Sequence, residues 1–205
     1  MGRTSTAREQ LIGAARTLMH ARGYGAIGVA EICERADVRK GSFYYFFDSK
    51  QALTIAALQS AWAAERGRWV ETLGGEPGIR GLEHLIRQQV ESQRDWRQSS
   101  GTVLGCLYGN LALEAGADEP ALREFLRELF EDQTELVRAS LGEAAAEGVV
   151  PAERAGAASA RAILAQLEGA VMFAKLYDDP SELDGLWQQI LSLLGARFEM
   201  PATGS

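Results

Sequence analysis

The sequence is poor in the residues that build disulfide, metal and cofactor sites. It has two cysteines and two histidines in 205 residues. It contains no CxxC, HExxH, Walker-type or G-x-S-x-G pattern, and no dinucleotide-binding glycine pattern follows a strand. Cys33 and Cys106 lie far apart and cannot form a disulfide framework, so we expect a reducing cytoplasmic environment, although a thiol switch stays open. We expect no catalytic residue, no metal and no cofactor, and therefore not an enzyme.

Long hydrophobic runs are also missing. No apolar stretch approaches the roughly 18 residues that a membrane span needs, and the first residues, MGRTSTAREQ, are too polar for a signal peptide. Hydrophobic residues still make up 46% of the chain, which is enough for a sizeable core. We expect a protein with no membrane association.

Alternating strand patterns are absent, and apolar residues recur at spacings of three and four, which predicts an all-α fold. A first helix ends at Gly23, and about eight more are expected at residues 29–35, 40–46, 48–73, 79–96, 103–115, 119–147, 152–176 and 181–198. We predict two domains: a three-helix module at 1–47 and a larger helical body at 48–200.

Positive charge is concentrated at the N-terminal end. The whole chain carries a net charge of −7, yet residues 1–50 hold eight Lys or Arg against five Asp or Glu. A basic module on an acidic body is the distribution expected when one end of a protein meets phosphates.

Residues 29–53, VAEICERADVRKGSFYYFFDSKQAL, combine cations with a run of aromatic residues. Their spacing predicts a helix-turn-helix whose second helix buries Phe43 and Phe47. Lys and Arg neutralise phosphates, Ser and Tyr hydroxyls bond to phosphate oxygens, and Lys can reach guanine in the major groove. The predicted DNA-binding residues are Arg39, Lys40, Gly41, Ser42, Tyr44, Tyr45 and Lys50.

This segment resembles the DNA-binding signature of the tetracycline-repressor (TetR) family of bacterial regulators, and the resemblance is dense over about residues 6–55. It implies an all-helical homodimer that binds a palindromic operator in double-stranded DNA and takes a small molecule in its C-terminal body. Two positions depart from the family pattern: Arg39 replaces a small hydroxyl residue, and Gly28 replaces a Ser or Thr.

The body resembles the family only weakly. The helices at about 152–176 and 181–198 correspond to the family's dimer-forming pair, and their alanines and leucines suit close packing with a second copy. An effector pocket needs a few polar groups in an apolar hollow. The candidate ligand-binding residues are Trp69, Tyr108, Asn110, Phe130, Gln166 and Phe173. Few cations lie on the central helices at 103–115 and 152–176, which favours an apolar or aromatic effector over a phosphorylated one.

We therefore expect a ligand-responsive transcriptional regulator, a repressor that a small effector releases from its operator. Two alternatives remain: a DNA-binding regulator without a small-molecule effector, and a helical enzyme or adaptor that keeps the fold.

Overall fold

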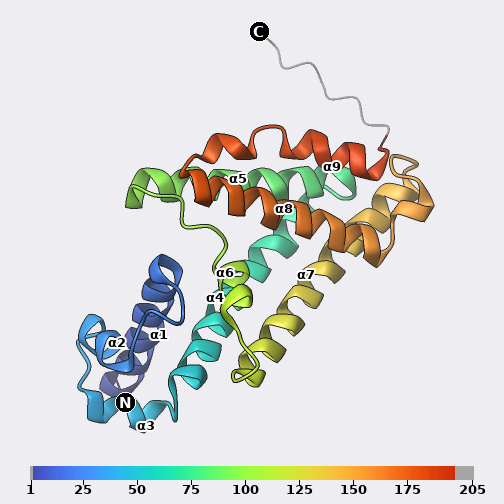
Figure 1. The fold of residues 1–205 in the computed structure, drawn as a ribbon. Coiled ribbons are helices and arrows are strands. Elements are labelled where there is room, and N and C mark those ends of the chain that lie inside the picture. Colours follow the sequence, from blue (N-terminus) through green and yellow to red (C-terminus); the bar gives the residue numbers. More distant parts are fainter. Residues whose placement is uncertain (1, 197–205) are drawn as a thin grey trace. The chain divides into compact units, whose positions relative to one another are not determined.

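The computed structural model describes residues 2–196, and within that range the chain forms helices and turns without a strand (Figure 1). The all-α prediction is confirmed. The helices are α1 (Gly2–Arg22), α2 (Val29–Arg35), α3 (Lys40–Phe46), α4 (Lys50–Gly75), α5 (Ile79–Ser100), α6 (Leu107–Glu114), α7 (Pro120–Ala146), α8 (Ala157–Tyr177) and α9 (Leu186–Leu194), with two 3-10 turns, η1 (Ala152–Arg154) and η2 (Pro180–Leu183).

The chain divides into two compact units. Unit 1 comprises residues 1–66 and 104–130, and unit 2 comprises residues 67–103 and 131–205. Helices α4 and α7 therefore each contribute to both units. The predicted domains at 1–47 and 48–200 are continuous in sequence, whereas the two units are not, and the predicted boundary stays a prediction.

Unit 1 contains the N-terminal module, in which α1 packs on α2 and α2 packs on α3, while α6 packs on α1 (Figure 1). Its core side chains are almost fully buried; the largest are Leu11, Met19, Ile32, Phe43, Leu53, Leu58, Leu111, Leu122 and Leu126. Burial of these side chains is the main source of stability, because α2 and α3 have seven residues each and helices that short are unstable alone.

Unit 2 is built around α8, which packs on η2 and α9, while α5 also packs on both of those elements. The two predicted dimer helices differ from the observed ones at their ends. Helix α8 starts after Gly156, and the second segment is broken between η2, which ends at Leu183, and α9, whose N-cap Gly185 has a left-handed φ of 81°. Residues 197 and 198 of that predicted segment lie outside the described range.

None of the helices within residues 2–196 combines the length and hydrophobicity that crossing a bilayer requires.

Candidate nucleic-acid interface

The helix-turn-helix of unit 1 holds α3 on a buried base. Ile32 and Cys33 of α2 and Phe43 of α3 are each no more than 3% exposed. The turn between the helices places Asp37 in the left-handed region at φ 52°, and the Val38 amide donates to the carbonyl of Cys33 (2.9 Å). The turn therefore fixes the direction in which α3 presents its other face.

The opposite face of α3 is open to solvent. All six predicted residues of this segment are exposed: Arg39, Lys40, Gly41, Ser42, Tyr44 and Tyr45. Tyr45 is 76% exposed and Tyr44 is 58% exposed, although each ring makes an edge contact with its neighbour, Phe46 and Phe43 respectively. A Cβ at Gly41 would meet no atom within 4 Å, so the backbone there is accessible. We call these six residues the reading surface.

The seventh predicted residue, Lys50, is engaged inside unit 1. Its ammonium donates hydrogen bonds to the carbonyls of Tyr24 (2.9 Å) and Ile27 (3.1 Å) and lies 3.9 Å from the centre of the Tyr24 ring. Lys50 thereby ties the start of α4 to the turn between α1 and α2. An ammonium has three donors, so a DNA contact by Lys50 stays a prediction.

Two carboxylates near the α6–α7 turn hold the same α1–α2 turn and α4, and sequence reasoning did not assign them this role. Glu114 accepts a hydrogen bond from the amide of Gly25 (2.9 Å). Glu119 accepts hydrogen bonds from the Tyr24 hydroxyl (2.5 Å) and from the Gln51 side-chain amide. We call Glu114 and Glu119 the carboxylate clasp.

The clasp affects its partners both electrostatically and sterically. Burial, the hydrogen bond to Glu119 and its negative charge raise the pKa of the Tyr24 phenol well above its ordinary value, so Tyr24 stays a donor. A Cβ on Gly23, which has φ 85°, would lie 2.4 Å from a Glu114 carboxylate oxygen, so glycine is required there. The clasp is thus a close-fitting contact.

The candidate ligand-binding residues fall in both units. In unit 1, the Tyr108 hydroxyl donates to Glu65 (2.9 Å) and the Asn110 side chain donates to the carbonyl of Leu104 (3.0 Å). In unit 2, Trp69 is buried, Gln166 donates to Gln189 (2.9 Å), and Phe173 is 46% exposed and stacks on Tyr177. Their role in ligand binding stays a prediction.

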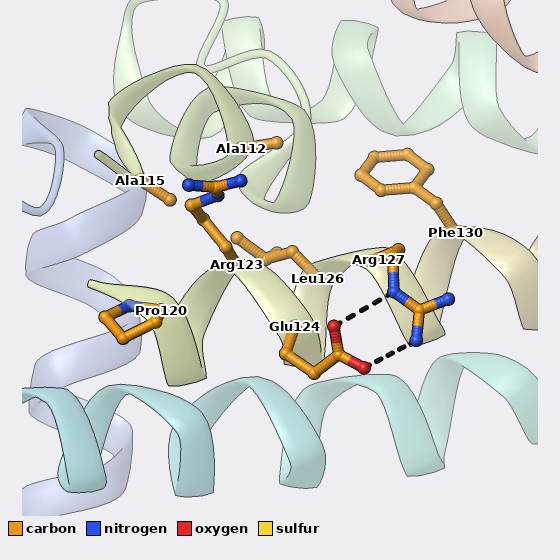
Figure 2. Close-up of a pocket in the computed structure, with 8 residues that line it drawn as sticks. All are labelled: Ala112, Ala115, Pro120, Arg123, Glu124, Leu126, Arg127 and Phe130. Carbon is orange, nitrogen blue, oxygen red and sulfur yellow. Dashed lines mark hydrogen bonds and ion pairs between the residues drawn. The ribbon is translucent and has the colours of Figure 1, made fainter. Parts of the chain in front are cut away.

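Phe130, the sixth candidate, lines an open hollow of about 560 Å³ in unit 1, within the usual size range of small-molecule sites. The hollow lies between α6 and the first turns of α7 (Figure 2). The residues lining it are Ala112, Ala115, Pro120, Arg123, Glu124, Leu126, Arg127 and Phe130. We call it the α6–α7 hollow.

Other chemistry has little support in the part of the chain that is described. Residues 2–196 hold no group of three His, Cys, Asp or Glu side chains that could bind a metal ion. Cys33 is buried, and burial raises the pKa of its thiol, which disfavours the reactive thiolate. The Cys106 sulfur accepts a hydrogen bond from the Gly109 amide (3.4 Å) at the start of α6.

Comparisons with known proteins match both parts of the chain. Residues 11–57 match the family model described as "Bacterial regulatory proteins, tetR family", and residues 81–190 match the one described as "Tetracyclin repressor-like, C-terminal domain". The transcriptional regulator AcuR of Cereibacter sphaeroides is 31% identical over 179 residues, covering 87% of this chain and 81% of AcuR. The repressor NemR of Escherichia coli is 34% identical over 108 residues, covering 52% and 53%.

Solved structures share the fold. The regulatory protein TetR from Rhodobacter sphaeroides superposes with a TM-score of 0.79 at 29% identity and covers 90% of this chain and 96% of its own. Reduced NemR of E. coli gives a TM-score of 0.77 at 24% identity, with coverage of 92% and 97%. The family's regulators bind DNA and act as dimers, and the family and these relatives are regulators, not enzymes. The chain belongs to the TetR family of bacterial transcriptional regulators.

Proposed function

We propose that this regulator is a repressor that binds a palindromic operator as a homodimer and leaves it when a small apolar or aromatic effector binds. The main support for the proposal is the reading surface. It presents two cations, a serine hydroxyl and two exposed tyrosines on one side of α3, while the other side of that helix is buried. The names of NemR and of DhaR from Mycobacterium, both called repressors, favour repression over activation.

The reading surface has the chemistry of a major-groove contact. Arg39 and Lys40 supply positive charge at the start of α3, where phosphates or guanine edges lie within reach. The exposed rings of Tyr44 and Tyr45 suit contacts with thymine methyl groups, and their hydroxyls suit phosphate oxygens. A palindromic site would present two half-sites about 34–36 Å apart, one for each copy.

An apolar surface at the end of α8 supports dimerisation through the last helices. Four large side chains that are 46–68% exposed follow one another along its final turns: Met172, Phe173, Leu176 and Tyr177. Exposed apolar surface of this kind is the mark of an interaction site, and a second copy would cover it by forming a four-helix bundle from two α8–α9 pairs.

A gel-shift assay on the DNA upstream of the protein's own gene tests the DNA-binding part. We expect a shift that Lys40→Ala combined with Tyr44→Ala abolishes and that Arg80→Ala, which removes an exposed cation from α5 of unit 2, leaves unchanged. Binding should weaken steeply with salt because phosphate contacts release counterions. Equal binding by the double variant and the wild type would remove the recognition-helix assignment.

A thermal-shift screen of small molecules, with each hit tested for operator release, separates an effector-controlled repressor from a regulator without an effector. A stabilising compound that releases the DNA supports the first function. Operator binding that no stabilising compound alters supports the second.

A further inference from the structure

The α6–α7 hollow contains one cation that the protein itself does not neutralise. Arg127 is held by two hydrogen bonds to the Glu124 carboxylate (3.0 and 2.5 Å). Arg123, by contrast, has no side-chain hydrogen bond or ion pair anywhere within residues 2–196. Figure 2 shows its guanidinium directed toward the end of α6, between Ala112 and Ala115. The hollow therefore offers one unpaired guanidinium.

The surroundings of that guanidinium are mostly apolar. Leu126 is 2% exposed at the base of the hollow, and the ring of Phe130, Ala112 and the ring of Pro120 supply the rest of the apolar lining (Figure 2). A guanidinium pairs best with a planar anion such as a carboxylate, through two parallel hydrogen bonds. An apolar surface beside it favours a ligand that carries a hydrocarbon or aromatic body.

We propose that the α6–α7 hollow binds a small monocarboxylate with an apolar or aromatic body, whose carboxylate pairs with Arg123 and whose body lies against Leu126 and Phe130. This deepens the proposed function, on which its regulatory part rests, because it assigns an effector class and a site to unit 1.

The position of the hollow links it to the clasp. Two of its lining residues, Ala115 and Pro120, are the sequence neighbours of Glu114 and Glu119. Both carboxylates hold the N-terminal module, through Gly25 and through Tyr24 with Gln51. A ligand that moves the end of α6 away from the start of α7 therefore loosens contacts to the α1–α2 turn and to the start of α4, the two segments that flank the helix-turn-helix.

Ligand binding in the hollow can lower operator affinity only by favouring one conformational state over another. A ligand shifts a protein between two states only by the difference in its affinity for them. If the state with an opened α6–α7 turn binds the carboxylate more tightly, the ligand favours the state in which the clasp is loosened. The orientation of the reading surface is then less well fixed, and operator affinity falls.

Isothermal titration calorimetry on the full-length protein tests the site without DNA. The probes are 3-phenylpropionate and, as a neutral match of the same shape, 3-phenylpropanamide. The variants are Arg123→Gln and a control, Arg138→Gln, which removes a guanidinium that pairs with Glu135 farther along α7. We expect wild type and Arg138→Gln to bind the acid about threefold to fivefold more tightly than the amide, because an exposed ion pair contributes up to about 1 kcal/mol.

Arg123→Gln should bind acid and amide equally, with an unchanged thermal melting curve because Arg123 is exposed. A preference for the acid that survives in Arg123→Gln, equal binding of the two probes by wild type, or no binding of either at millimolar concentration would each overturn the site.

A gel shift on the upstream DNA then tests the coupling. The acid should weaken operator binding by wild type and not by Arg123→Gln; acid that binds through Arg123 and leaves operator affinity unchanged would overturn the coupling. Absence of any DNA binding by unliganded wild type would instead be a failure of the proposed function, and calorimetry would still decide the site.

Discussion

The reading surface and the α6–α7 hollow belong to the same unit, yet they are built in opposite ways. The reading surface comes from six of the seven consecutive positions 39–45, and the seventh, Phe43, supports it from the buried side of α3. The hollow is assembled from the end of α6, the start of α7 and the turn between them. The reading surface depends on one buried anchor, whereas the clasp beside the hollow depends on contacts between segments that are remote in sequence, and variants can separate the two.

The largest effect should come from removing the anchor of the reading surface. Phe43 is fully buried, so Phe43→Ala leaves a cavity in the N-terminal module and should lower the free energy of unfolding by about 3–5 kcal/mol. Chemical denaturation measures this loss, and operator binding in the gel shift should disappear with it.

Tyr45→Ala provides the control on the same helix. Its ring is 76% exposed, so its loss should change the free energy of unfolding by less than about 0.5 kcal/mol while it weakens operator binding. Comparable destabilisation by the two variants would mean that the reading surface is itself part of a packed interface.

Loss of a clasp hydrogen bond should lower the free energy of unfolding by a smaller amount. Tyr24→Phe removes the hydroxyl that donates a hydrogen bond to Glu119. The free energy of unfolding should fall by about 1–2 kcal/mol, because a hydrogen bond to a partly buried carboxylate is lost. Tyr45→Phe, in which the ring is 76% exposed, is the matched control and should be neutral. Chemical denaturation of the two variants compares them, and equal stability would show that the Tyr24–Glu119 hydrogen bond contributes nothing to the fold.

The contrast explains what the sequence could predict. The helix-turn-helix was predictable because its information is local: apolar spacing marks Ile32 and Phe43 as core, and the intervening polar residues must then face outward. Pro120 as a helix start signal and Gly148 as a stop signal likewise predicted both ends of α7 to within a residue or two.

The clasp was not predictable because it joins residues remote in sequence, and the hollow was not predictable because it depends on how α6 and α7 pack. Tyr24 and Glu119 are 95 residues apart, and no periodic pattern relates them. Arg123 lies on the exposed side of a helix rich in paired charges, where sequence alone cannot distinguish it from Arg127. Lys50 was placed correctly at the start of α4, but only the fold brings the carbonyls of Tyr24 and Ile27 to its ammonium.

Lys40 and Lys50 should differ in what they contribute, because Lys40 is exposed and Lys50 is hydrogen-bonded inside unit 1. Lys50→Met should lower the free energy of unfolding by about 1 kcal/mol, because the ammonium loses two carbonyl acceptors and its position on the Tyr24 ring. Lys40→Met should leave stability unchanged, because Lys40 is exposed, but should reduce the salt dependence of operator binding by about one counterion for each protomer. Chemical denaturation and gel shifts at several salt concentrations measure both. A reduced salt dependence for Lys50→Met would show that it also contacts a phosphate.

The smallest effect on stability should come from the carboxylate of Asp178 in unit 2. Its side chain is 43% exposed, so its contacts are more open to solvent than the one between Glu119 and Tyr24. Asp178 accepts hydrogen bonds from the Val103 amide (2.8 Å) and the Thr102 hydroxyl (2.9 Å), and these bonds, with Arg97, hold the pKa of its carboxyl below the usual value. A lowered folded-state pKa adds stability above the unfolded value of about 3.9 and loses it as the pH falls toward the folded value. Asp178→Asn keeps a residue that tolerates the observed φ of 54° and removes only the charge. Its melting temperature should therefore lie slightly below that of wild type at pH 7, and thermal melts should show the gap closing as the pH is lowered below about 4. A gap that is the same at every pH would contradict a stabilising role for the charge of Asp178, because at low pH neither protein carries that charge.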